Sequence, residues 1–143
     1  MPECSKNNTL FVPLVARINI SKKFPEYFYD EKALELEQYL PQGADKESSE
    51  YSNMAAVARY YNMDKTVTEF VKRCAESNII YLGVGLETAY DRLNKNLRDR
   101  VIHWYAADLP EVIEARKKVL RVQLCILESM IVKNLLTNVV WNF

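Results

Sequence analysis

Apolar residues at helical spacing dominate the first third of the chain. Side chains three or four positions apart predict a helix over Leu10–Ile18, and an irregular aromatic segment, Phe24–Tyr29, follows it. Asp30 is placed to cap a short helix, which Pro41 and Gly43 then close. The N-terminal region is therefore predicted to be helical.

A polar loop over residues 42–50 precedes a second stretch of helical pattern. The apolar positions predict one helix over residues 51–61 and another over 64–74, with a break at Asn62 between them. We therefore expect residues 1–77 to form an N-terminal helical cap region.

The pattern changes its period in the second half of the chain. The continuous apolar run Ile79–Leu82 predicts a strand buried on both faces, which is typical of parallel sheets. A helix is predicted over Thr88–Leu97, a second strand over Val101–Ala107 and a further helix from Pro110. This order predicts an α/β fold that begins like a doubly wound nucleotide-binding sheet.

Composition and charge narrow the class of protein. With 143 residues, 49% of them hydrophobic, the chain is expected to form one globular core. The 19 basic residues balance the 19 acidic ones, which argues against nucleic-acid and membrane partners. No long apolar stretch or leader pattern is present, so a cytoplasmic location is expected. Three widely spaced cysteines suggest neither a disulfide framework nor a metal site.

The strongest local signal is a pair of glycines directly after the first predicted strand. Gly83 and Gly85 lie in Leu82-Gly83-Val84-Gly85-Leu86-Glu87-Thr88, which we call the glycine loop. Glycine permits a tight turn and lets a ligand approach the backbone where the next helix presents free amide groups. Thr88 stands where a dinucleotide-binding fingerprint has its third glycine.

An acidic residue completes this pattern. Asp108 follows the second predicted strand, where an acid in such folds accepts hydrogen bonds from ribose hydroxyls. The same residue also fits the N-cap of the helix that begins at Pro110. The spacing leaves both interpretations open, and it does not name a cofactor.

Several ordered motifs resemble one known family. The sequence is similar to the leucine carboxyl methyltransferase family, including bacterial O-methyltransferases related to polyketide-tailoring enzymes, over about residues 8 to 120. Glu87 replaces the aspartate that is commoner in the family's glycine loop. The motifs that carry the resemblance are Asn8-Thr9-Leu10-Phe11-Val12-Pro13-Leu14, Ala16-Arg17, Ser21-Lys22-Lys23-Phe24-Pro25, Phe28-Tyr29-Asp30, Ala58-Arg59-Tyr60-Tyr61, the glycine loop, and Trp104-Tyr105-Ala106-Ala107-Asp108-Leu109-Pro110-Glu111-Val112-Ile113.

The resemblance implies a Rossmann-like class I methyltransferase fold with S-adenosylmethionine (SAM) as cofactor. Lys22 and Arg59 resemble the basic residues that hold the methionine carboxylate of SAM. Gly83 and Gly85 resemble the loop beneath the cofactor, and Asp108 resembles the ribose-binding acid. No catalytic residue is assigned by the resemblance.

Plainer interpretations of the polar residues remain open. Lys22 is exposed by default, and Arg59 has Asp64 and Glu69 within reach as ion-pair partners on a helix face. His103 has no acid or nucleophile nearby in the pattern, so we expect a core or hydrogen-bonded histidine rather than a general base and assign it no role.

Members of the family are about twice as long as this chain. The resemblance therefore implies a truncated sheet, with residues 78–120 as a partial SAM-binding region and residues 121–143 as an atypical apolar tail. A half-sheet leaves an unpaired strand edge and an uncovered apolar face, which favour self-association.

Three functions follow from these expectations. The first is SAM-dependent O-methyl transfer to a carboxylate or hydroxyl of a small molecule or peptide, or an inactive truncated form of such an enzyme. The second is a nicotinamide-dependent oxidoreductase, which Thr88 disfavours. The third is a non-catalytic remnant that binds a partner through its exposed sheet edge and apolar tail, or that has no function.

Overall fold

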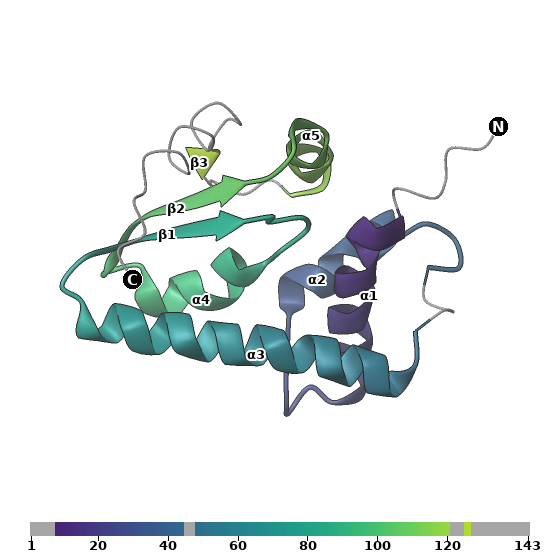
Figure 1. The fold of residues 1–143 in the computed structure, drawn as a ribbon. Helices are drawn as coiled ribbons and strands as arrows, with labels where there is room; N and C mark the ends of the chain where they lie inside the picture. The colour runs from purple at the N-terminus through teal and green to yellow at the C-terminus, as the bar shows by residue number, and fades with distance from the viewer. Residues whose placement is uncertain (1–7, 45–47, 121–124, 127–143) are drawn as a thin grey trace, which may run out of the picture.

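The computed structural model describes residues 8–44, 48–120 and 125–126, and it has an α/β fold (Figure 1). Most of the predicted tail, residues 121–143, lies outside the described residues. The elements, in chain order, are α1 (Asn8–Lys23), α2 (Glu31–Glu35), the 3₁₀ helix η1 (Leu36–Tyr39), α3 (Glu50–Arg73), β1 (Ser77–Leu82), α4 (Ala89–Leu97), β2 (Val101–Ala107), α5 (Pro110–Val119) and β3 (Cys125–Ile126).

Local side-chain chemistry sets where several helices begin. The Asp30 carboxylate accepts a hydrogen bond from the backbone amide of Ala33 (2.9 Å), so the predicted cap of α2 is confirmed. The Ser49 hydroxyl caps α3 in the same way. Pro110 occupies the first turn of α5, where its missing amide hydrogen has no cost.

Residues 50–73 form one continuous helix, so the predicted break at Asn62 is wrong. Asparagine lowers helix propensity by less than about 1 kcal/mol relative to alanine, unlike proline, and packing overrides it. Val57 on one half of α3 is buried against α1, and Val71 on the other half is buried against α4 and the sheet. Each half of α3 is therefore buried in its own apolar cluster, and this packing outweighs the weaker helix propensity of Asn62.

The sheet has the strand order β1-β2-β3. The parallel pairing of β1 with β2 was predicted, whereas β3, which also pairs in parallel with β2, lies in the segment that was predicted to be an apolar tail. Leu82 at the end of β1 pairs with Ala107 at the end of β2, so the loops that follow both strands leave the sheet at the same edge. Figure 1 shows α3 and α4 on one side of the sheet and α5 beyond the end of β2.

The prediction that the first strand is buried on both faces is wrong. Ile79 and Tyr81 pack toward the cluster formed with α3 and α4. Ile80 and Leu82, which alternate with them, are 48% and 62% exposed. The described helices that pack on β1 lie on the side of Ile79 and Tyr81, so the other apolar face of β1 remains open.

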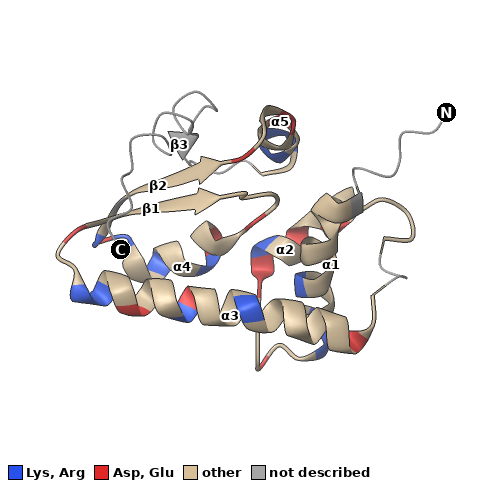
Figure 2. Ribbon diagram, in the orientation of Figure 1, with Lys and Arg blue, Asp and Glu red and all other residues tan. Residues whose placement is uncertain are grey.

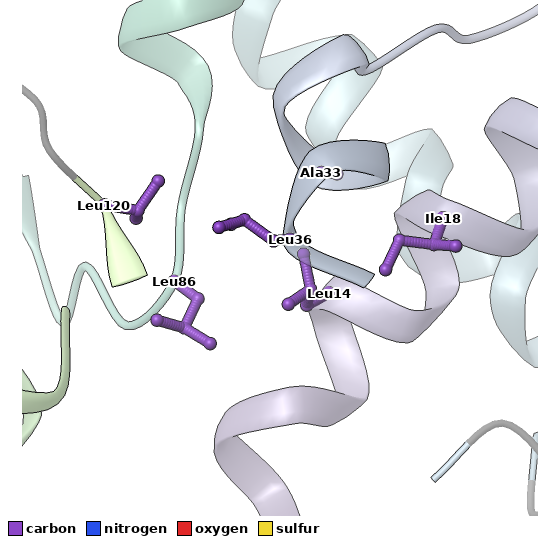
Figure 3. Close-up of a cluster of buried hydrophobic side chains, with 6 residues drawn as sticks. All are labelled: Leu14, Ile18, Ala33, Leu36, Leu86 and Leu120. Atoms are coloured by element: carbon purple, nitrogen blue, oxygen red, sulfur yellow. The ribbon is translucent and has the colours of Figure 1, made fainter. Parts of the chain in front are cut away.

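The N-terminal helices pack directly onto the loop after β1. An apolar cluster joins α1 and the α2–η1 segment to that loop and to the end of α5, and it consists of Leu14, Ile18, Ala33, Leu36, Leu86 and Leu120 (Figure 3). This packing places α1 beside the predicted glycine loop.

Charges of both signs are interspersed along α3 (Figure 2). None of the described helices combines the length and the apolar character needed to span a membrane.

Candidate functional site

The predicted glycine loop adopts the backbone conformation that glycine is needed for. Gly83 and Gly85 have φ angles of +65° and +47°, in the left-handed region that side chains with a Cβ rarely adopt. The amides of Gly83 and Val84 both donate to the carbonyl of Ala107, at 2.8 Å and 3.3 Å. The loop is therefore held against the end of β2.

Asp108 also holds the glycine loop against the end of β2. Its Oδ2 accepts a hydrogen bond from the amide of Gly85 (2.7 Å), and its Oδ1 accepts one from the amide of Leu109 (2.7 Å). The N-cap residue of α5 is Leu109, so Asp108 is not the helix cap that the sequence also permitted. Each carboxylate oxygen can still accept a further hydrogen bond from a ligand hydroxyl.

The structure brings Gly83, Gly85 and Asp108 together at a pocket of about 690 Å³. This volume is typical of small-molecule and cofactor sites. Residues of α1, the glycine loop, the segment after β2 and Tyr60 of α3 form its walls, among them Leu10, Arg17, Gly83, Gly85, Asp108 and Glu111.

The other two predicted cofactor residues do not line this pocket. Lys22 is exposed at the end of α1 and forms an ion pair with Glu37. Arg59 is exposed on α3. His103 is exposed on β2, so it is not a core histidine.

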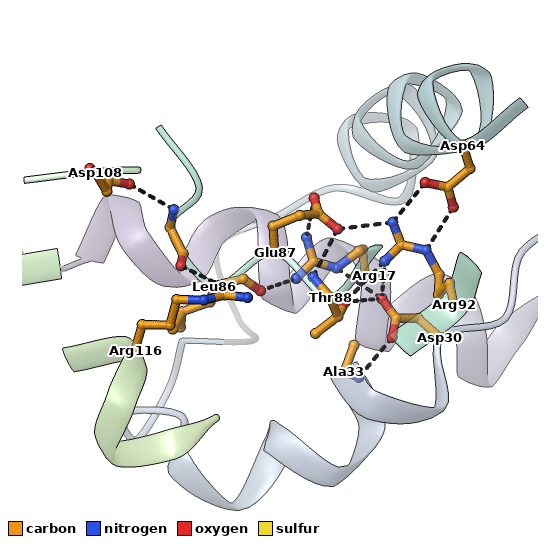
Figure 4. Close-up of polar contacts among 11 residues, drawn as sticks. Arg17, Asp30, Ala33, Asp64, Leu86, Glu87, Thr88, Arg92, Asp108 and Arg116 are labelled. Atoms are coloured by element: carbon orange, nitrogen blue, oxygen red, sulfur yellow. Dashed lines mark hydrogen bonds and ion pairs between the residues drawn. The ribbon is translucent and has the colours of Figure 1, made fainter. Parts of the chain in front are cut away.

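A cluster of largely buried charged side chains adjoins the glycine loop, and Arg92 of α4 contacts three of its acids (Figure 4). The guanidinium binds Asp64 through two hydrogen bonds, of 2.7 Å and 3.0 Å. It also donates to Asp30 (2.6 Å) and to Glu87 (2.9 Å). Arg92 therefore joins α2, α3 and the glycine loop.

The charges in this cluster influence one another. Burial opposes ionisation of Arg92, but the hydrogen bonds with Asp64 and the charges of Glu87 and Asp30 raise its pKa above the ordinary value. Burial raises the pKa of Asp64, although Arg92 opposes the rise. The arginine is thus held in its charged form inside the protein.

Arg17 of α1 belongs to both the cluster and the pocket wall. Its Nη2 donates to the carbonyl of Leu86 (2.6 Å), and its Nε lies 3.2 Å from Oδ2 of Asp30. Its guanidinium stacks 4.6 Å from the centre of the Tyr60 ring. Burial raises the pKa of Tyr60, so its phenol stays neutral at physiological pH.

Sequence reasoning missed the roles of Arg17, Asp64 and Arg92, and it predicted only capping for Asp30. One signal was available for Arg17. In the sequence it lies among the apolar residues Leu14, Val15 and Ile18 of the predicted helix, a position that rarely accepts an unpaired charge.

The glycine loop uses its own amides for internal bonds. The amide of Glu87 donates to the carbonyl of Val84 (2.9 Å), and the amide of Thr88 donates to the Glu87 carboxylate (2.8 Å). The amide of Gly85 is bound to Asp108. The expectation that this turn presents free amides to a ligand is therefore wrong for these residues.

Comparisons with known proteins do not assign a family to the chain. A scan against protein-family models and searches of curated proteins and of solved structures found no match. The function is therefore argued from the geometry of the pocket.

Proposed function

We propose that the chain binds SAM in the glycine-loop pocket, as part of a methyltransferase site on a Rossmann-like sheet. The observation that carries the proposal is the bond from the Gly85 amide to Asp108, at the pocket wall where two parallel strands end. In open α/β sheets, ligands bind at the carboxyl ends of the strands.

The chemistry of the pocket fits a nucleoside-containing ligand. Asp108 has acceptor capacity left for the two hydroxyls of a ribose. Leu10 and Leu14 of α1 supply apolar wall on the other side of the loop. A largely apolar pocket with a few convergent polar groups is typical of a cofactor site.

The same geometry disfavours a nicotinamide dinucleotide, whose pyrophosphate needs loop amides as donors. The amides of Gly85 and Thr88 are already bound to the side chains of Asp108 and Glu87. Asp108 and Glu111 also place carboxylates at the pocket, where they would repel a phosphate. SAM carries no phosphate, so it does not need these amides as donors, and its methionine carboxylate would have to lie away from Asp108 and Glu111.

The proposed reaction is methyl transfer to an oxygen of a small molecule or peptide. SAM supplies a methyl group that its sulfonium already activates, so the protein's contribution is alignment of the acceptor and exclusion of water. A carboxylate acceptor would need no base. The proposal names no catalytic residue, and it does not rest on Lys22 or Arg59.

Calorimetric titration of the full chain with SAM tests the proposal. Asp108→Ala removes the pocket carboxylate, and Asp99→Ala removes an acid whose side chain is 95% exposed, which makes it the matched control. We expect saturable binding by the wild type and by the control, and at least a tenfold weaker affinity for Asp108→Ala, because a charged acceptor is lost. Absence of binding by a folded wild-type sample would overturn the proposal.

A further inference from the structure

Two arginines from different helices hold successive carbonyl groups of the glycine loop. Arg116 of α5 donates to the carbonyl of Gly85 (3.0 Å), and Arg17 of α1 donates to that of Leu86 (2.6 Å). The amide of Gly85 is bound to Asp108 at the same time. Three side chains therefore fix the backbone of two adjacent residues at the pocket wall.

Arg17 differs from Arg116 in what holds it in place. Its side chain is 1% exposed, and its Nη1 lies 3.6 Å from Oε2 of Glu87. Asp30, which is fully buried, faces its Nε and also accepts a hydrogen bond from the Thr88 hydroxyl (2.5 Å). Carboxylates on two other segments thus orient the guanidinium that holds Leu86.

We infer that Arg17 is a positioning residue for the pocket, fixing the Leu86 carbonyl and the Tyr60 ring in its wall. Arg17 and Tyr60 both line the pocket and stack on each other, so movement of the guanidinium would displace both parts of the wall. The effect on the loop stands by itself, whereas the effect on ligand affinity rests on the proposed SAM site.

A lysine at this position keeps the charge but loses the geometry. An ammonium group on one flexible stem cannot reproduce a planar fork that faces Leu86, Asp30 and Glu87 together. Arg17→Lys therefore separates positioning from net charge.

Hydrogen exchange and calorimetry on the full chain test the inference. The matched control is Arg100→Lys, because Arg100 also donates to two backbone carbonyls, those of Lys72 and Cys74, and lies outside the pocket wall. In Arg17→Lys we expect the amides of residues 85–88 to exchange about tenfold faster, with amides of α3 unchanged, because a charged hydrogen bond to the loop is lost. SAM affinity should fall about tenfold as well, and the control should show neither change.

The two readouts keep this inference distinct from the proposed function. If the wild type binds no SAM, the proposed function fails and the exchange rates alone decide whether Arg17 positions the loop. Unchanged loop exchange in Arg17→Lys would overturn the inference. An equal acceleration in the loop and in α3 would also overturn it, because it would indicate general destabilisation. Faster loop exchange with an unchanged SAM affinity would overturn its ligand part.

Discussion

The Asp108 carboxylate and the Gly85 amide are joined by a hydrogen bond of 2.7 Å across 23 positions of the chain. The bond connects the end of β2 to the loop that follows β1, and it leaves the acid facing the pocket. One carboxylate therefore shapes the loop and remains able to accept hydrogen bonds from a ligand. This hydrogen bond is formed with Gly85 at a positive φ angle of +47°.

Gly85→Ala is expected to weaken both stability and ligand binding. The positive φ of Gly85 is unfavourable for alanine by about 1–2 kcal/mol, and the added Cβ would lie 3.5 Å from Leu10. Gly43→Ala is the control, because Gly43 also has a positive φ (+80°) and no atom near the added Cβ. Urea unfolding should show a similar loss for both variants, whereas calorimetry should show weaker SAM binding only for Gly85→Ala. Equal binding by the two variants would contradict the placement of Gly85 at the ligand site.

Arg92→Met is expected to cost about 3–5 kcal/mol in the free energy of unfolding. The substitution leaves the buried Asp30 and the partly buried Asp64 and Glu87 without their common cation. Lys117→Met is the control, because Lys117 pairs with Glu114 on an exposed helix face and should cost less than about 1 kcal/mol. Denaturant unfolding of both variants measures the difference. A loss for Arg92→Met as small as the control's would show that the cluster does not stabilise the fold.

Asp91→Asn is expected to stabilise the protein slightly at neutral pH. Burial raises the pKa of the Asp91 carboxyl, although Lys32 opposes the rise. The folded state therefore binds the proton more tightly than the unfolded chain, and the resulting stability is present below the unfolded pKa and is lost as the pH rises through the folded value. The gain from Asp91→Asn should be below about 1 kcal/mol, because the group is partly exposed.

The pH dependence of that gain is the decisive measurement. Unfolding curves recorded between about pH 3 and about pH 7 should show the advantage of Asp91→Asn growing with pH. Asp99→Asn is the control, because the side chain of Asp99 is 95% exposed. A gain that shrinks as the pH rises would refute the assignment.

Ile80→Lys is expected to reduce self-association. Within the part of the chain that the structure describes, β1 is an edge strand without a charged residue, and Ile80 lies on its open face. Charged residues on an edge strand oppose pairing with a second chain. Sedimentation velocity should show concentration-dependent association of the wild type that Ile80→Lys lowers. Tyr51→Lys, on a residue 83% exposed on α3, should leave it unchanged, and a monomeric wild type would rule out association at this edge.

Local signals in the sequence predicted much of the fold. The Asp30 cap, the start of α5 at Pro110 and the parallel strand pair depend on nearby residues, and the structure confirms them. The continuity of α3 through Asn62 and the exposure of Ile80 depend on what packs against each element, which a local pattern does not contain.

The candidate site also combines features that a local sequence pattern indicates with features that depend on tertiary packing. Gly83, Gly85 and Asp108, which the sequence singled out, lie at one pocket because parallel strands bring their following loops to one edge. The bond between Arg92 and Asp30 spans 62 positions and depends on how three helices pack together. No spacing rule predicts such a contact.

The Arg92 cluster also bears on how the chain can be divided. The proposed boundary at residue 77 separates Asp30 and Asp64 from Glu87 and Arg92. A fragment that begins at residue 78 would carry an arginine with a single remaining carboxylate, and the complementary fragment would carry two acids and Arg17. We therefore expect the helical and sheet regions to unfold as one cooperative unit. A substitution at any of these positions should be tolerated only when its partners are substituted too.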